Sequence, residues 1–196
     1  MEFQDVVRKR RMVRRFRADK PLPDEVVARL LDNATRGPSA GFSQGQAFLA
    51  LRGDDLRRFW GLGDAWAFES VQETAQLVIV PLACKQVYLD RYSESDKGWT
   101  DKAESHWPVP YWHIDTGMAA LLILQTAVDE GLGALLFGIA PQDTAKFRAE
   151  FGVPEDHDPI GAIAIGYPDE PKVHPESSAA KRPRRDRNAV IHHGNW

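Results

Sequence analysis

Apolar side chains follow a helical spacing in two long segments of the chain. Residues 21–37 carry them every three or four positions, at Val26, Val27, Leu30, Leu31 and Ala34. This spacing predicts an amphipathic helix, which Gly37 and Pro38 end. Residues 113–130 are apolar almost all round and run into Gly131 and Gly133. They predict a central helix that its neighbours bury.

Shorter apolar runs predict the strands. Residues 76–84, rich in Val, Ile and Leu, predict a strand buried on both faces, and 47–52, 134–139 and 161–167 predict further strands. Short helices are expected at 2–11, 54–63 and 141–152. Residues 85–112 are polar and aromatic without a clear period, and we expect a long excursion with some helix. This order of elements indicates an α+β or mixed α/β fold in one domain, 1–196.

Composition is ordinary for a globular protein, with 196 residues of which 43% are hydrophobic. No apolar run reaches the roughly 18 to 20 residues of a membrane span, and the start lacks the apolar stretch of a secretory signal. We therefore expect a cytoplasmic protein that binds no membrane. The single Cys84 ends an apolar run, which favours a buried, inert thiol over a nucleophile.

Charge is segregated along the chain. Eight basic residues and one acid lie within 8–20, and five basic residues and one acid within 181–187. The remaining chain has 12 basic and 26 acidic residues, so two basic ends flank an acidic body. Such ends could be solvated tails, nucleic-acid arms or two halves of one anion site.

Four motifs resemble those of one known family. They are RRMVRRF at 10–16, GPSAGFSQ at 37–44, DTGMAALLILQTAVDEGLG at 115–133, and IGYPDEP at 165–171 followed by KRPRR at 181–185. In this order they are similar to the motifs of the nitroreductase-like flavoproteins. The resemblance implies an α+β fold with a central mixed or antiparallel sheet, flanking helices and a buried central helix. It also implies an intertwined homodimer that holds FMN at the subunit interface.

The resemblance further implies how the two ends of the chain are used. A basic N-terminal helix is expected over about 2–17. An extended C-terminal segment, about 168–196, is expected to pack on the partner subunit. The sequence of this segment agrees, because it ends RNAVIHHGNW, which is too apolar and aromatic for a simple solvated tail.

Cofactor-binding residues follow from the same motifs. The positions that match the family's FMN contacts are Arg10, Arg11, Met12, Arg14, Pro38, Ser39, Gln44, Phe137, Gly138, Ile139, Arg184 and Arg185. The chemistry agrees, since a phosphate dianion is well matched by guanidinium groups from two directions. The polar loop at 37–48 would offer backbone amides and the Gln44 side chain to a flat, carbonyl-edged ring.

The activity implied is that of an FMN-dependent NAD(P)H oxidoreductase. NADPH or NADH would reduce the flavin, and a nitroaromatic, quinone or similar small-molecule acceptor would reoxidise it in a ping-pong cycle. Arg14 is the candidate catalytic residue, stabilising negative charge on the reduced ring. Aromatic residues at Phe42, Trp107, Tyr111 and Trp112 are candidate walls of the substrate pocket. Met12 and Phe42 depart from the family, which usually has Ser and Asn there.

The sequence also bears on three other classes of function. A metal site is not expected, because no pair of His residues has the helical spacing of zinc proteases. A nucleic-acid-binding module could use the basic ends, although the acidic body would repel a polyanion. A relative that only binds or sequesters flavin, without turnover, is the remaining alternative.

Overall fold

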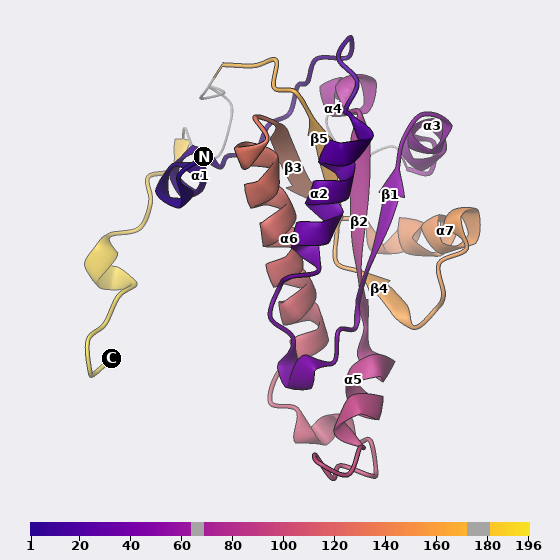
Figure 1. The fold of residues 1–196 in the computed structure, drawn as a ribbon, viewed down its shortest axis with the longest axis vertical. Coiled ribbons are helices and arrows are strands. Elements are labelled where there is room, and N and C mark those ends of the chain that lie inside the picture. The colour runs from indigo at the N-terminus through magenta and orange to yellow at the C-terminus, as the bar shows by residue number, and fades with distance from the viewer. Residues whose placement is uncertain (64–68, 172–180) are drawn as a thin grey trace.

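A computed structural model describes residues 1–63, 69–171 and 181–196 of the chain. Its centre is a five-stranded antiparallel sheet (Figure 1). The strands lie in the order β1 (Gln46–Leu51), β2 (Leu77–Cys84), β5 (Ala162–Gly166) and β3 (Gly133–Phe137). A short strand, β4 (His157–Pro159), pairs with the far end of β2. The predicted α+β fold is confirmed, and the sheet, which was predicted to be mixed or antiparallel, is antiparallel.

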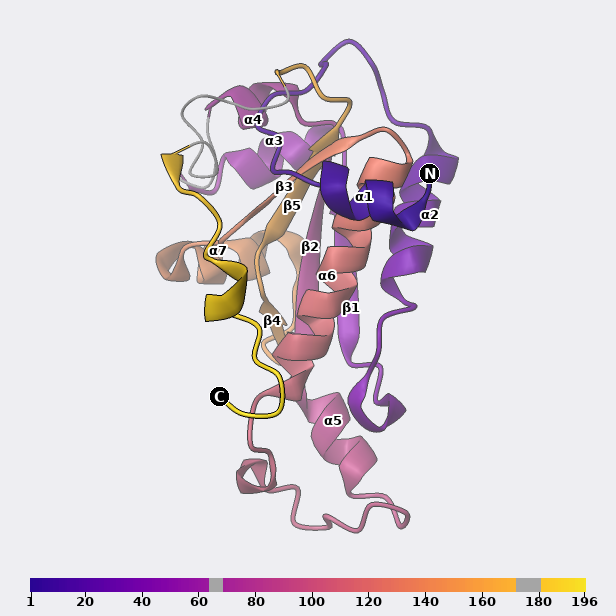
Figure 2. The ribbon, with the colours of Figure 1, turned by 90° about the vertical axis from the view of Figure 1, so that its left-hand side faces the viewer.

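The sheet is covered on both faces, as Figure 2 shows. Leu77 and Ile79 of β2 pack on the side of α2 (Asp24–Ala34) and α6 (Tyr111–Asp129). Val78 and Val80 point the other way, into a core shared with α3 (Asp54–Trp60) and α7 (Pro141–Phe151). Every residue of β2 is buried. The alternation explains the continuous apolar run, because both faces of this strand meet a core.

The remaining elements are short helices, helical turns and one short strand. Helix α5 (Lys85–Tyr92) confirms the helix expected in the polar excursion, and a helical turn, η2 (Glu104–His106), follows it. Helix α4 (Glu69–Thr74) and strand β4 were not predicted. Two further turns are η1 (Ala40–Phe42) and η3 (Arg187–Ala189). No helix among the described residues is long and apolar enough to cross a membrane.

The predicted basic helix over about 2–17 is wrong in length. Helix α1 (Phe3–Lys9) stops where Arg10 turns to extended backbone. Beyond it, Met12 forms a parallel bridge with Ala134, and Phe16 an antiparallel bridge with Pro168. The side chain of Phe16 is buried. Burial against the sheet therefore outweighs the helical preference of the charged residues.

The predicted C-terminal segment, about 168–196, begins with residues that contact their own chain. Pro168 pairs with Phe16, and the Asp169 N–H donates to the Arg15 carbonyl at 3.0 Å, so this part packs on its own chain. Residues 172–180 lie outside the described residues. The segment 181–196 projects away from the sheet (Figure 1), and Val190, Ile191 and Trp196 are exposed.

Helix α6 is central, but the described residues of the chain leave part of its surface open. Ala120, Ile123 and Ala127 face the core, whereas a stripe on its other side is open. Ile114, Met118 and Leu121 are 37%, 40% and 44% exposed. Their spacing of four and three places them on one helix face. We call these three residues the α6 stripe.

Candidate functional site

The basic motif forms the first half of the candidate site and is organised by Glu170. The Arg11 Nη1 donates to Glu170 Oε1 at 2.5 Å, and the Arg14 backbone N–H donates to Glu170 Oε2 at 2.9 Å. The side chain of Glu170 is 3% exposed. On the other side, the Ser70 hydroxyl donates to the Arg14 carbonyl at 2.9 Å. The backbone of Arg14 is thus held from two directions.

Met12 joins this half to the sheet. Besides its bridge to Ala134, its Sδ accepts a weak hydrogen bond from the Leu136 N–H at 3.5 Å. The basic motif therefore lies along β3, whose end carries Phe137, Gly138 and Ile139. A Cβ placed on Gly138 would meet no atom within 4 Å, so the space beside it is open to a ligand or a partner. The C-terminal end of helix α1 lies at Arg10, and the partial negative charge of this helix end favours cations over anions.

The loop at 37–45 forms the second half of the candidate site and is held by a hydrogen bond to helix α6. The buried Asp115 of α6 accepts the Ala40 N–H at 2.8 Å and the Tyr88 hydroxyl at 2.9 Å on the same oxygen. The Ser39 Oγ accepts the Gln44 N–H at 2.8 Å. Burial, together with the Asp115 carboxylate, raises the pKa of Tyr88 well above its ordinary value. Tyr88 therefore stays a neutral donor to Asp115.

This network uses several of the backbone amides that the loop was expected to offer to a ring. Five of its N–H groups already have partners inside the chain, those of Gly37, Ala40, Phe42, Ser43 and Gln44. The Ser39 hydroxyl is likewise used within the loop. Three residues of the loop are exposed, which are Pro38, Phe42 and Gln44.

Phe42 is displayed by a strained backbone. Gly41, Phe42 and Gln44 have φ values of 60°, 55° and 58°, in the left-handed region that residues other than glycine seldom adopt. A Cβ on Gly41 would lie 2.5 Å from the Tyr92 ring, and the Gly41 carbonyl accepts from Arg91 Nε at 3.0 Å. The ring of Phe42 is 75% exposed. Strain of this kind gathers at functional sites.

The predicted pocket aromatics lie beneath this loop. Trp107 contacts Tyr92, Trp112 and Tyr111, with ring centroids 4.4, 5.9 and 5.8 Å away. Trp112 is buried with Tyr88 in a small core, on which Trp107 and Tyr111 pack half-buried. Within one chain Trp107 and Trp112 therefore support the loop, and Phe42 is the aromatic that is presented outward.

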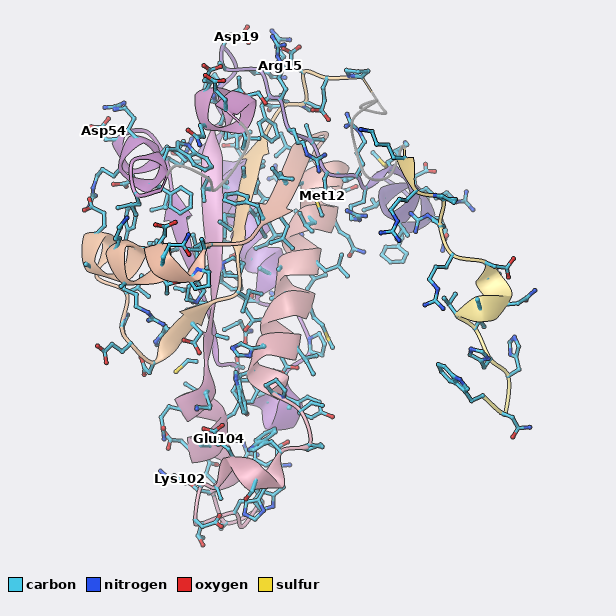
Figure 3. All side chains as sticks on the ribbon, turned by 180° about the vertical axis from the view of Figure 1, so that it is seen from behind. Met12, Arg15, Asp19, Asp54, Lys102 and Glu104 are labelled. Atoms are coloured by element: carbon cyan, nitrogen blue, oxygen red, sulfur yellow. The ribbon has the colours of Figure 1, made fainter. Side chains whose placement is uncertain are left out.

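The two halves lie at opposite ends of α6. The loop is bonded to Asp115 near the start of the helix, whereas Met12 pairs with Ala134, just past its end. The helix from 115 to 129 rises about 21 Å at 1.5 Å per residue. In Figure 3, Met12 lies in the upper half of the molecule, whereas Lys102 and Glu104 of the polar excursion lie at its lower end. One chain does not bring the predicted site together.

The basic C-terminal residues are not gathered to the site either. Arg184 and Arg185 belong to the projecting segment, where Arg185 Nη2 donates to the Ala189 carbonyl at 3.1 Å. Several N-terminal cations are neutralised locally: besides Arg11, Arg15 pairs with Asp169 at 3.5 Å and Arg17 with Asp19 at 2.9 Å. These ion pairs reduce the charge that the N-terminal motif would offer to a nucleic acid.

One cluster of potential ligands was missed by sequence reasoning. Cys84, Asp156 and His157 each place a potential ligand atom within 4.8 Å of the other two. The thiol is buried, as predicted, and burial raises the pKa of Cys84. Sequence reasoning had considered Cys84 and His157 separately, since 73 positions divide them.

Comparison with known proteins gives one family. The profile described as the nitroreductase family matches residues 7–167. An NADPH-dependent oxidoreductase of Staphylococcus aureus is 24% identical over 193 residues, covering 98% of this chain and 73% of that protein. A protein of Archaeoglobus fulgidus, named for NADH dehydrogenase or NAD(P)H nitroreductase activity, is 25% identical and covers 95% of this chain and 94% of its own.

Solved structures show the same fold. Nitroreductase CinD from Lactococcus lactis, in complex with nicotinic acid, has a TM-score of 0.79 at 17% identity, covering 99% of this chain and 100% of that one. A structure from Exiguobacterium sibiricum, described as a nitroreductase in complex with FMN, has a TM-score of 0.74 at 19% identity, covering 98% and 97%.

Proposed function

The chain belongs to the nitroreductase family, and from that premise we propose that it is an FMN-dependent NAD(P)H oxidoreductase. Its proposed acceptors are nitroaromatics, quinones or similar conjugated compounds. The proposal draws on the oxidoreductase and nitroreductase names of its relatives and on the FMN named for one structural neighbour.

The residues present fit FMN as a ligand. Arg10 and Arg14 offer guanidinium groups, which suit a phosphate. The open space beside Gly138 leaves room for a flat ring next to the backbone. The exposed side chains of Phe42 and Gln44 add an apolar surface and an amide from the loop.

The observation that carries the proposal is the division of the site between the two ends of α6. Each half is rigidly held, yet they lie too far apart within one chain to surround one ring. The α6 stripe runs between them and is exposed and apolar. We propose that two chains pair across this stripe as a homodimer. The Arg10–Arg14 motif of one chain would then meet the Phe42 loop of the other.

The chemistry that FMN supplies when bound is acceptance of hydride from NADPH or NADH, followed by electron transfer to an acceptor that replaces the nicotinamide. Arg14 is the residue proposed to stabilise the negative charge that develops on the ring. Its backbone is fixed by Glu170 and Ser70, so its orientation costs little reorganisation. Phe42 is proposed to stack on aromatic acceptors.

Four predicted site residues take supporting roles in this proposal, which are Arg11, Met12, Arg184 and Arg185. Arg11 holds Glu170, and Met12 keeps the motif against β3. The projecting segment would reach the partner subunit and place Arg184 and Arg185 near a phosphate there. Trp107, Tyr111 and Trp112 would support the loop that forms one wall of the pocket.

The test is an absorption spectrum of the purified protein after FMN addition and desalting, followed by anaerobic NADPH and then NADH. Retained flavin bands that bleach with either nicotinamide would support the proposed activity. Retained bands that bleach with neither would favour a protein that only sequesters flavin. Loss of all flavin on desalting would contradict the assignment of FMN as the cofactor.

A further inference from the structure

We propose that Cys84, Asp156 and His157 form a binding site for a divalent transition-metal ion of the zinc class. The site lies outside the candidate flavin site and does not depend on the proposed function. It is built from residues of two segments that meet only in the folded chain.

The sheet brings the three side chains together. Cys84 is the last residue of β2, and the antiparallel register pairs it directly with His157, the first residue of β4. Directly opposed residues have Cβ atoms about 4.5–5.5 Å apart on one face of a sheet. Asp156 precedes His157 in the turn that leads into β4. Two ligands are therefore positioned by regular backbone pairing and not by a loop alone.

The ligand atoms are close to the spacing of a zinc centre. Cys84 Sγ lies 3.7 Å from Asp156 Oδ2, and His157 Nδ1 lies 2.7 Å from Asp156 Oδ1. A tetrahedral zinc ion with ordinary bond lengths has ligand atoms about 3.3–3.6 Å apart. Asp156 is exposed and His157 is partly exposed, so rotation of their side chains would open room for the ion.

The donor set and the surrounding charge suit such an ion. Thiolate, imidazole and carboxylate together favour zinc and related transition metals over calcium or magnesium. Glu155 adds negative charge beside Asp156. The nearby cation, Arg148, is occupied by Asp158 at 2.9 Å and by the Pro154 carbonyl. Binding would replace the thiol proton, which leaves to solvent, and water would fill the fourth position.

The site is structurally adjacent to the Phe42 loop. The Cys84 N–H donates to the Gly45 carbonyl at 2.8 Å, and Cys84 also precedes α5. An ion held at Cys84 would therefore stabilise the contact between β2, β4 and the Phe42 loop. We expect the bound ion to raise the melting temperature of the protein.

The experiment is a Co²⁺ titration of the full chain after treatment with a chelator. We expect one Co²⁺ per chain, with a thiolate-to-cobalt charge-transfer band, and displacement of this band by Zn²⁺. Cys84→Ser should abolish the band. His157→Asn should weaken Co²⁺ binding by about tenfold or more. Because His157 is partly exposed, this variant should fold even where Cys84→Ser does not.

His106→Asn is the matched control. His106 forms a similar imidazole–carboxylate pair with Asp101, at 2.9 Å, but no cysteine contributes to it. This variant should bind Co²⁺ as the unaltered chain does. The proposal is overturned if the titration gives no thiolate band, if His157→Asn binds with unchanged affinity, or if His106→Asn removes the binding.

Discussion

Glu170 determines how the basic motif presents its charges. Its buried carboxylate accepts from the Arg11 guanidinium and from the Arg14 backbone, so one acid fixes two neighbouring positions of the motif. A buried carboxylate needs such donors, because an unpaired one would be costly to desolvate. The arrangement gives Arg11 a structural task and leaves the backbone of Arg14 preorganised.

Replacing Arg14 with alanine should weaken FMN binding by about 10- to 100-fold, because a hydrogen bond to a charged group contributes roughly 1.5–3 kcal/mol. Equilibrium titration of flavin fluorescence measures the change. Arg15→Ala is the matched control, since Arg15 is a neighbouring arginine that is 64% exposed and pairs only weakly with Asp169. Equal losses in the two variants would remove Arg14 from the proposed site.

Asp115 holds the loop, so its loss should destabilise the protein. Asp115→Ala leaves two donors without their acceptor, the buried Tyr88 hydroxyl and the half-buried Ala40 N–H. At about 1–3 kcal/mol for each unsatisfied group, the free energy of unfolding should fall by about 2–4 kcal/mol. Urea denaturation measures it. Asp32→Ala, on the exposed face of α2, should change it by less than about 0.5 kcal/mol.

Tyr88 predicts a pH dependence with a definite sign. Burial and Asp115 raise its pKa in the folded protein, whereas an unfolded tyrosine ionises near pH 10. The contribution of Tyr88 to the free energy of unfolding is therefore fully present below about pH 10 and is lost as the pH rises further. The stability difference between the unaltered chain and Tyr88→Phe should shrink above about pH 10, by up to about 1.4 kcal/mol per pH unit. A constant difference would show that Tyr88 ionises normally.

At the scale of the elements, the α6 stripe predicts the oligomeric state. Leu121→Glu places a charge in the proposed interface, which should shift the protein from dimer to monomer and reduce FMN retention. Light scattering coupled to size exclusion measures the mass. Val87→Glu is the control, since Val87 is a comparably exposed apolar residue on α5. A dimer that survives Leu121→Glu but not Val87→Glu would place the interface elsewhere.

Periodicity predicted the elements whose own side chains form the core. The long helices α2 and α6 and the strand β2 follow directly from apolar spacing, because each buries the residues that define its pattern. Strand β4 is too short and polar to show alternation. The end of α1 was misplaced because Val13 and Phe16 are buried by the sheet, which is a tertiary contact that local preference does not contain.

The same limit applies to the sites. The motifs at Arg10–Arg14 and at 37–44 were recognisable because each is contiguous. The separation of these two motifs by the length of α6 could not be recognised, because it depends on how the strands between them are ordered. The cluster at Cys84 depends on the pairing of β4 with β2, and no spacing within the sequence could indicate it.

At the scale of the whole molecule, the projecting segment and the open stripe belong together. A single chain exposes Val190, Ile191 and Trp196 as well as Met118 and Leu121. Exposed apolar surfaces of this extent commonly mark an interface. A second copy could cover both kinds of surface with the same two-fold operation.

The division of the site across α6 has a genetic consequence. If each site draws on two chains, two inactive variants should complement each other. Arg14→Ala damages one half and Gln44→Ala the other, so a mixed dimer would contain one doubly altered site and one intact site. Refolding the two variants together should restore about one quarter of the sites by random pairing. Activity that stays at the level of the separate variants would mean that each chain carries its own complete site.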